Sequence, residues 1–285
     1  MGPFQRVWVT GAGGLIGHEV VQSAALYAPD IQVQGTTRTD VDLTNTAAVQ
    51  ETFTRLQPQI IIHCAALTKT GLCEQHPSLA WSLNVEATAR LADVAHNIPF
   101  IFFSTDLVFD GRQGHYDEMA PANPLSVYAR TKVEAERRVL ANPGHTVIRT
   151  SLNGGTSPTG DRGFNEEMRR AWQDGRMLKL FTDELRCPIP AAVTARAVWE
   201  LILSNAIGLY HVAGAERLSR WQIGSLLASR WPQLNPRVEA ASRIDFPGPP
   251  RPADTSLNCA KAQKLLSFPL PGLTEWLDAH PDEVF

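Results

Sequence analysis

The chain has 285 residues, with 26 Lys and Arg against 29 Asp and Glu, a net charge of -3, and 44% hydrophobic residues. This composition is typical of globular proteins and excludes disordered, collagen-like and coiled-coil chains. At roughly 150 residues per domain, the length predicts about two structural units. The sequence contains neither a long basic run nor the ~20 consecutive apolar residues of a membrane span, so we expect neither nucleic acid nor a membrane as a partner.

The cysteines and the first residues indicate where the protein works. Residues 1–10 run straight into strand-like sequence, without the charged and apolar leader of a secreted protein. The four cysteines form neither a C-x-x-C pair nor a zinc-binding pattern. We therefore expect a cytoplasmic protein with reduced thiols and no metal site.

The first half of the chain alternates short apolar runs with segments of helical spacing. Such alternation is typical of βαβ units around a parallel sheet. Strands are expected over residues 6–10, 31–37, 59–65, 100–104 and 145–150. Helices are expected over residues 14–27, 46–56, 79–96 and 124–140. The predicted fold class is α/β, a Rossmann-type doubly wound parallel sheet.

The periodicity changes after residue 150, where residues 153–160 have the composition of a loop. Helices are expected further on, over residues 164–174, 191–204 and 219–230. We expect an NAD(P)-binding Rossmann domain over residues 1–152, rejoined by parts of residues 181–212. Residues 153–285 form the expected smaller, mixed α/β substrate-binding portion.

A glycine-rich turn, G-x-x-G-x-x-G, follows the first strand and opens the first helix, with glycines at Gly11, Gly14 and Gly17. Glycine permits positive φ and lets the backbone approach a diphosphate, which the helix N-terminus then holds. A turn used only for packing is the alternative reading. The position directly after a first strand favours a nucleotide site.

The residues after the second strand bear on the choice of dinucleotide. A carboxylate there would bind the ribose 2′-hydroxyl of NAD, but the chain reads Thr36-Thr37-Arg38. Arg38 could pair with a 2′-phosphate, which favours NADP(H) while leaving NAD(H) open, or it could be a solvated surface residue. Asp42 could accept from the adenine amino group or cap the helix near Thr46.

Tyr128 and Lys132 are four residues apart, on the same face of one helical turn. A free tyrosine has a pKa near 10, and a fixed cation beside it would stabilise the phenolate. Ketone reduction needs such a proton donor, because charge builds on the carbonyl oxygen as hydride arrives. A hydroxyl that would polarise the carbonyl is available in Ser104-Thr105-Asp106, at the end of the fourth predicted strand.

These motifs resemble those of the extended short-chain dehydrogenases/reductases, and most closely the dTDP-4-dehydrorhamnose reductase group. The resemblance runs over nearly the whole chain. It is carried by TGAGGLIG at 10–17, PQIIIHCAA at 58–66, FSTDLVFDG at 103–111, NPLSVYARTK at 123–132 and RPADTSLN at 251–258.

The resemblance implies roles for individual residues. Tyr128 would be the acid, Lys132 would lower its pKa and hold the nicotinamide ribose, and Thr105 would supply the hydroxyl. The implied cofactor-binding residues are Gly11, Gly14, Leu15, Ile16, Gly17, Arg38, Asp42, Leu43, Ala65, Ala66 and Lys132. The expected substrate-binding residues are Thr105, Asp106, Tyr128, Arg186 and Arg251, the two arginines being suited to a diphosphate.

Two departures from the group concern the substrate: Leu107 stands where the group has Tyr, and Leu152 where it has Trp. We expect an NADPH-dependent reductase of a nucleotide-linked 4-keto sugar, although the sugar itself stays open. The alternatives are a nucleotide-binding regulatory subunit of the methionine adenosyltransferase type and a sugar epimerase or dehydratase of the same superfamily. The oligomeric state is also open, a homodimer being one form.

Overall fold

The structure, a computed structural model, describes residues 5–283 and 285 of the chain. Its centre is a six-stranded parallel sheet with the strand order β10-β5-β4-β3-β1-β2. The strands are β1 (Arg6–Thr10), β2 (Gln32–Thr36), β3 (Ile60–His63), β4 (Phe100–Thr105), β5 (Thr146–Thr150) and β10 (Gly208–Val212). The predicted Rossmann-type fold is confirmed. The strand order reverses between β1 and β3, and open α/β sheets bind ligands at such a switch point.

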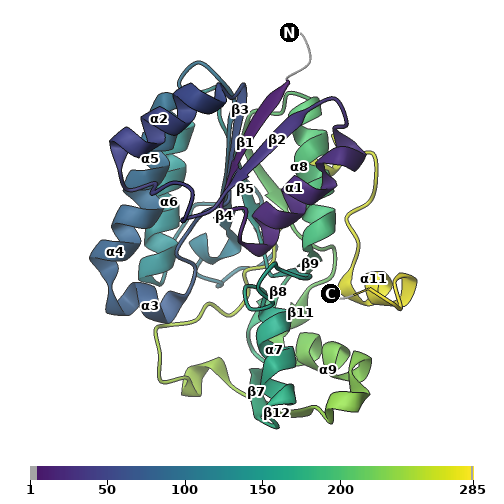
Figure 1. The fold of residues 1–285 in the computed structure, drawn as a ribbon. Helices are drawn as coiled ribbons and strands as arrows, with labels where there is room; N and C mark the ends of the chain where they lie inside the picture. Colours follow the sequence, from purple (N-terminus) through teal and green to yellow (C-terminus); the bar gives the residue numbers. More distant parts are fainter. Residues whose placement is uncertain (1–4, 284) are drawn as a thin grey trace.

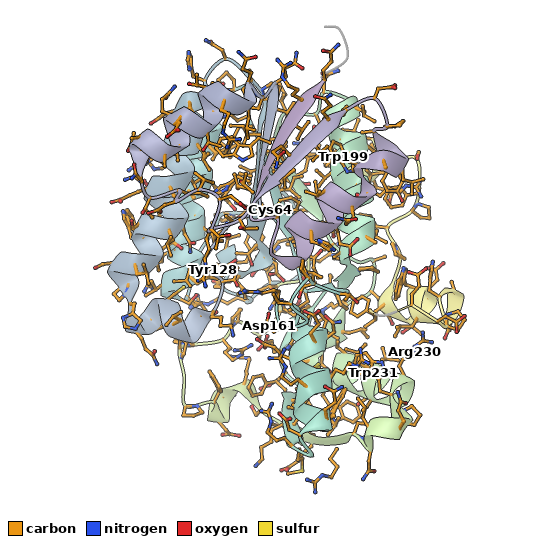
Figure 2. The ribbon with its side chains drawn as sticks, viewed as in Figure 1. Cys64, Tyr128, Asp161, Trp199, Arg230 and Trp231 are labelled. Atoms are coloured by element: carbon orange, nitrogen blue, oxygen red, sulfur yellow. The ribbon has the colours of Figure 1, made fainter. Side chains whose placement is uncertain are left out.

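Helices cover both faces of this sheet (Figure 1). One face packs against α1 (Leu15–Tyr27) and α8 (Ala191–Leu203). On that side the buried Trp199 donates from its indole N–H to the Val20 carbonyl at 3.2 Å (Figure 2). The other face packs against α2 (Thr46–Leu56), α5 (Ala87–Val94) and α6 (Val127–Leu140). Because both faces are covered, every residue of β3 is buried, which explains its unbroken apolar run.

After β5 the chain builds a smaller mixed portion beyond the carboxyl edge of the sheet (Figure 1). Its core gathers Trp172, Trp231 and Trp276. Its elements are β6 (Asn153–Gly154), α7 (Phe164–Gln173), β7 (Met177–Phe181), β8 (Leu185–Arg186), β9 (Ile189–Pro190), β11 (Leu218–Ser219), α9 (Arg220–Arg230), β12 (Arg237–Ala241), α10 (Ala260–Gln263) and α11 (Leu273–Ala279). Partway through it, α8 and β10 return the chain to the large sheet.

The prediction of one uniform helix over residues 79–96 is wrong. The chain instead runs through α4 (Pro77–Trp81), a π-helical turn (Ser82–Glu86) and α5, after the short α3 (Thr70–Gln75). The π-helical turn carries Asn84, whose side chain accepts from the Leu67 backbone N–H at 2.7 Å. The Asn84 amide also donates to the Thr131 hydroxyl of α6 at 3.0 Å. The widened turn thus ties the loop after β3 to α6, and π-helical turns are frequent at functional sites.

Helix α6 begins later than predicted, at Val127 instead of Pro124. Ser126 caps it by accepting from the backbone N–H of Ala129 at 3.2 Å. Glu74 of α3 accepts from the Val127 N–H at 2.6 Å. These two side chains accept hydrogen bonds from backbone N–H groups at the start of the helix. They thereby fix the position of its first turn, which carries Tyr128.

Candidate active site

The predicted site residues converge at the carboxyl edge of the sheet. The last residues of four neighbouring strands are Thr10 of β1, His63 of β3, Thr105 of β4 and Thr150 of β5, with Thr10 paired with His63 and Thr105 with Thr150. Figure 2 places Cys64, which follows β3, in the centre of the molecule, with Tyr128 on the neighbouring α6. Motifs separated by more than a hundred residues therefore meet at one edge.

The glycine turn packs closely against the loop after β3. Gly11 has φ +76°, and a Cβ there would lie 2.5 Å from the backbone nitrogen of Ala65. The turn ends at Gly14, the N-cap of α1, which has no side chain to bond the first free N–H groups of the helix. Close packing of the turn is compatible with a nucleotide-binding role, because a tight turn with uncapped N–H groups is suited to a diphosphate.

The turn after β2 contains a carboxylate that the sequence analysis left out. Asp40 accepts from both the backbone N–H and the hydroxyl of Thr37, each at 2.7 Å, and these bonds lower the pKa of its carboxyl. Arg38 beside it is exposed and forms no ion pair with any described residue. The side chain of Arg38 therefore remains available to an anionic ligand.

Asp42 does not cap α2, so that alternative is wrong. Asn45 caps the helix instead, accepting from Ala47 and Ala48 at 3.0 and 3.2 Å. Asp42 accepts from the backbone N–H and the hydroxyl of Thr44 at 2.9 and 2.7 Å, which lowers the pKa of its exposed carboxyl. Asp42 thus organises a local turn and keeps an exposed edge, as a contact with adenine would require.

Tyr128 and Lys132 are both buried, 7% and 2% exposed, on the same side of α6. Tyr128 packs among apolar side chains that include Cys73 and Leu107. The Lys132 ammonium lies 4.0 Å from the ring centroid of Phe102, an arrangement that favours the cation. Neither group forms a salt bridge with a described residue.

Burial shifts the pKa values of both groups toward their neutral forms. It raises the pKa of Tyr128, an effect that the carboxylate of Asp106 reinforces and the Thr105 hydroxyl opposes. It lowers the pKa of Lys132 to about 7, against the opposing effect of Glu136. The expected lowering of the Tyr128 pKa is therefore not found, because desolvation and the Asp106 carboxylate outweigh the lowering by the Thr105 hydroxyl and Arg186. The phenol stays protonated at neutral pH, the form that a proton donor needs.

Thr105 ends β4 and connects the Tyr128 region to a buried carboxylate. Its hydroxyl accepts from the Leu107 N–H at 3.2 Å and donates to Asp106 at 3.2 Å. The preceding Ser104 is also buried, and its hydroxyl has no hydrogen-bond partner in the described part of the chain.

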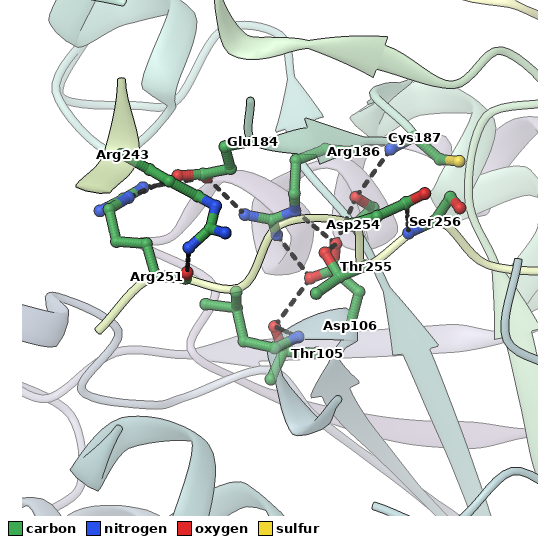
Figure 3. Close-up of polar contacts among 12 residues, drawn as sticks. Thr105, Asp106, Glu184, Arg186, Cys187, Arg243, Arg251, Asp254, Thr255 and Ser256 are labelled. Atoms are coloured by element: carbon green, nitrogen blue, oxygen red, sulfur yellow. Dashed lines mark hydrogen bonds and ion pairs between the residues drawn. The ribbon is translucent and has the colours of Figure 1, made fainter. Parts of the chain in front are cut away.

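Asp106 is the centre of a polar network and has no exposed surface (Figure 3). Both of its carboxylate oxygens bond the Arg186 guanidinium. Ser151 and Thr255 donate to the same carboxylate at 2.7 and 3.0 Å. Asp106 and Arg186 were expected to contact substrate, but their bonding groups are taken up by each other. The geometry favours a role in positioning Thr105 and the strand ends.

Arg251 is the other arginine expected at a substrate diphosphate. Its Nε and Nη2 both donate to the carboxylate of the buried Glu184. It also lies 5.1 and 5.2 Å from the rings of Phe181 and Phe246. With 29% of its side chain exposed, it keeps one accessible edge.

Sequence reasoning overlooked two polar residues, one behind helix α6 and one near this network. Asn84 lies within a helical spacing of apolar residues, and its bonds to Leu67 and Thr131 cross between segments remote in sequence. Arg220 was not singled out, because it follows Ser219 in a capping box with Gln222 and is typical of a helix start. The signal that would have found Arg220 is its neighbourhood, which only the fold reveals.

Within the described residues, no group of three or more His, Cys, Asp or Glu side chains could hold a metal ion. All four cysteines are free thiols. Residues 5–283 and 285 include no helix with the length and apolarity of a membrane span.

Comparison with known proteins gives consistent matches along the whole chain. The family described as "RmlD substrate binding domain" matches residues 5–284. A dTDP-4-dehydrorhamnose reductase from Sinorhizobium fredii is 30% identical over 285 residues, covering 95% of this chain and 94% of that protein. A methionine adenosyltransferase 2 subunit beta from Danio rerio is 29% identical over 279 residues, covering 92% of this chain and 85% of that protein.

The solved structures include a dTDP-4-dehydrorhamnose reductase from Bacillus anthracis in complex with NADP. Its TM-score to this chain is 0.88, at 24% identity, with 96% of this chain and 98% of that chain covered. At this identity the likeness supports the fold.

Proposed function

The chain belongs to the RmlD substrate binding domain family, and from this premise we propose that it is an NADPH-dependent reductase of a nucleotide-linked 4-keto sugar. The arrangement that supports the proposal is Thr105 at the end of β4, Tyr128 and Lys132 buried one turn apart on α6, and an uncapped glycine turn after β1. The relative from Sinorhizobium fredii, a dTDP-4-dehydrorhamnose reductase, supports this class of substrate.

The residues around the switch point fit NADP(H), which when bound supplies the hydride that reduces a ketone. In this proposal the diphosphate lies against Gly11, Gly14 and Gly17, near the N–H groups of Leu15 and Ile16 at the start of α1, and the exposed Arg38 meets the 2′-phosphate. The remaining assigned contacts are Asp42 and Leu43 at the adenine, Ala65 and Ala66 along the cofactor, and Lys132 at the nicotinamide ribose.

Tyr128 supplies the proton in this proposal. As hydride reaches the carbonyl carbon, the phenolic proton moves to the carbonyl oxygen and the product is the alcohol, with the negative charge left on the Tyr128 oxygen. The Thr105 hydroxyl, which favours the ionised phenol, stabilises that charge. Lys132, one helical turn away, adds a positive charge whenever it is protonated.

The proposed substrate site departs from the dTDP-4-dehydrorhamnose reductase group at two positions, where this chain has leucine in place of the group's Tyr and Trp. Leu107 packs against Tyr128, and Leu152 packs into the core of the smaller portion. Neither offers an aromatic face to a sugar ring, so we infer a related 4-keto sugar. We assign the cofactor to residues 1–152 with parts of 181–212, and most of the substrate contacts to residues 153–285.

A second candidate function is a regulatory subunit without useful catalysis, which the likeness to methionine adenosyltransferase 2 subunit beta favours. The complete set of Thr105, Tyr128 and Lys132 favours the enzyme instead. An epimerase or dehydratase would use the cofactor transiently and consume none.

The proposal extends to a cytoplasmic location, with which four free thiols are consistent. Assembly as a homodimer is the state to test, by light scattering of the purified protein.

The experiment mixes purified protein with NADPH and each member of a panel of nucleotide-linked 4-keto sugars, beginning with dTDP-4-dehydrorhamnose. We expect stoichiometric NADPH oxidation and formation of the corresponding alcohol with at least one sugar. Bound cofactor with altered sugar but no net NADPH consumption would indicate an epimerase or dehydratase. No turnover on any sugar, together with co-purification of a methionine adenosyltransferase, would indicate the regulatory subunit.

A further inference from the structure

Four arginines lie around the buried Glu184: Arg186, Arg243 and Arg251, which Figure 3 shows, and Arg220, whose backbone N–H donates to the Glu184 carbonyl. Arg251 bonds the Glu184 carboxylate. Arg186 bonds Asp106 and lies 3.7 Å from Glu184. Arg243 donates to the carbonyls of Asp183 and Arg251 at 3.1 and 2.9 Å.

Arg220 is the exception. Its guanidinium is within 4.0 Å of no carboxylate in residues 5–283, and its Nη1 has almost no contact with solvent and no hydrogen-bond partner there. Burial lowers the pKa of Arg220 to about 10. The Arg220 residue as a whole is half-buried, but a buried N–H donor such as its Nη1 is normally satisfied, so leaving this one unpaired is costly to the folded protein.

The position of Arg220 connects it to the proposed reaction centre. It is the first residue of α9, and its backbone N–H donates to the Glu184 carbonyl at 2.9 Å. Its guanidinium carbon lies 5.2 Å from the ring centroid of Phe164, at the start of α7. The charges that act on it include those of Asp106 and Arg186, which also act on Tyr128. Arg220 therefore lies where the starts of α7 and α9 meet the Glu184 segment, close enough to the Asp106–Arg186 pair to feel its charges.

The charges in this group do not balance. Arg186, Arg220, Arg243 and Arg251 contribute four positive charges, and Asp106, Asp183 and Glu184 contribute three negative ones, Asp183 lying against Arg243. Since each of the other three arginines lies against one of these carboxylates, the excess positive charge is that of Arg220. An anionic ligand would supply both the missing charge and the missing acceptors.

We propose that Arg220 binds the diphosphate of the nucleotide-linked substrate and selects diphosphate-bearing ketones over neutral ones. This inference rests on the proposed function, and it moves the diphosphate contact from Arg186 and Arg251 to Arg220. A guanidinium offers its donors in a planar fork that matches phosphate oxygens. Arg186 and Arg251 hold Asp106 and Glu184 in place, which leaves Arg220 without a side-chain partner among the residues that the structure describes.

The test measures binding at equilibrium and needs no turnover. The protein is saturated with NADP+, so that the cofactor site is filled, and titrated calorimetrically with dTDP or UDP and with the neutral nucleosides thymidine or uridine. The variants are Arg220→Gln and Arg220→Lys. Arg176→Gln is the matched control, because Arg176 has 60% of its side chain exposed and pairs only loosely, at 3.5 Å, with Asp174.

We expect Arg220→Gln to weaken diphosphate binding at least about tenfold, the loss typical of a charged hydrogen bond, with nucleoside binding unchanged. Arg220→Lys should recover part of this loss, because it restores the charge without the fork. The Arg176→Gln control should bind both ligands like the parent protein.

Thermal unfolding of the ligand-free protein distinguishes binding from a structural role. If Arg220 is an unpaired buried charge, Arg220→Gln should unfold at the same or a higher temperature than the parent, and dTDP should raise its Tm less. A lower Tm in the absence of ligand, with an undiminished response to dTDP, would assign Arg220 to the scaffold and overturn the inference.

The inference also fails if neither diphosphate binds the parent protein, or if Arg220→Gln binds within about twofold of it. Diphosphate binding that depends on Arg220, without reduction of any sugar, would refute the proposed function alone. Turnover with unchanged diphosphate affinity in Arg220→Gln would refute the role of Arg220 alone.

Discussion

Two buried charges on helix α6, one turn apart, have very different surroundings. Glu136 is 4% exposed and accepts two hydrogen bonds from Arg149, at 2.9 and 2.7 Å. Lys132 is 2% exposed, and its ammonium lies over the Phe102 ring with no carboxylate within 4.0 Å among the described residues. The paired charge joins α6 to β5, while the unpaired charge lies beside Tyr128, where a cofactor would meet it.

The same contrast recurs around Asp106. Asp106 and Arg186 satisfy each other. Four buried side-chain atoms have no hydrogen-bond partner in the described part of the chain, at Arg90, Ser104, His145 and Arg220. Of these, Ser104 precedes Thr105 and Arg220 is the proposed diphosphate contact, and the following predictions test whether satisfied groups support the fold while unpaired groups near the site bind ligands.

The largest effect is expected from Tyr128→Phe, which removes the proton donor and keeps the ring. Reduction of the 4-keto sugar should slow by about 10²- to 10⁴-fold, the usual contribution of a positioned acid. The Kd for NADPH should stay within about twofold. Steady-state rates and fluorescence titration measure the two quantities, and Tyr27→Phe is the matched control. A rate near that of the parent would remove Tyr128 from the chemistry.

Asp106→Ala removes the buried carboxylate that pairs with Arg186. It leaves the buried Arg186 without its carboxylate, so the free energy of unfolding should fall by about 3–5 kcal/mol. Denaturant unfolding measures this, and Asp174→Ala, which removes an exposed carboxylate, should change stability by less than about 0.5 kcal/mol. Equal small losses of unfolding free energy for the two variants would show that the Asp106–Arg186 pair contributes little to the stability of the fold.

Lys132→Met removes the unpaired charge of α6. Because burial lowers the Lys132 pKa to about 7, the unfolded chain binds a proton there that the folded chain lacks between pH 7 and about 10.4. The penalty is complete below pH 7 and disappears as pH rises toward 10. Ligand-free Lys132→Met should therefore be more stable than the parent at pH 6, by up to on the order of 4–5 kcal/mol, and the gain should shrink at higher pH.

The control for this pH series is Lys179→Met, since 67% of the Lys179 side chain is exposed. It should show no comparable gain at any pH. If Lys132→Met destabilises the ligand-free protein equally at pH 6 and pH 9, Lys132 is satisfied in the folded state and the contrast with Glu136 is lost.

The smallest effect is expected from Arg38→Ala, which removes an exposed side chain in the turn after β2. The Kd for NADPH should rise by roughly tenfold, which is about 1.4 kcal/mol, while the Kd for NADH stays unchanged. Arg112→Ala, which removes an arginine with 86% of its side chain exposed, is the matched control. Equal weakening of both cofactors by Arg38→Ala would mean that Arg38 does not read the 2′-phosphate.

The sequence predicted the large sheet because its strands are buried on both faces and appear as unbroken apolar runs, such as Ile60–His63. The pair of β7 and β12 escaped prediction, since its two strands are some 60 residues apart and its residues are mostly half-buried or exposed. The π-helical turn at Asn84 kept a helical spacing of apolar residues, so periodicity alone could not detect it.

Residue types were easier to predict than partners. Tyr128 and Lys132 share one helix, so their spacing placed them on one face. Arg186 and Asp106 are 80 residues apart, and no local pattern shows whether an arginine meets a phosphate or a carboxylate. Arg220 was hidden for the same reason. The direction of the Tyr128 pKa shift was also missed, because desolvation depends on packing that the sequence does not display.

The most direct test is a crystal structure of the protein with NADP+ and an unreactive analogue of a nucleotide-linked 4-keto sugar. The account predicts the Tyr128 hydroxyl and the Thr105 hydroxyl both about 3 Å from the oxygen that replaces the ketone, with Lys132 at the nicotinamide ribose. A sugar oxygen well beyond hydrogen-bond reach of Tyr128, or a nicotinamide bound away from Lys132, would contradict it.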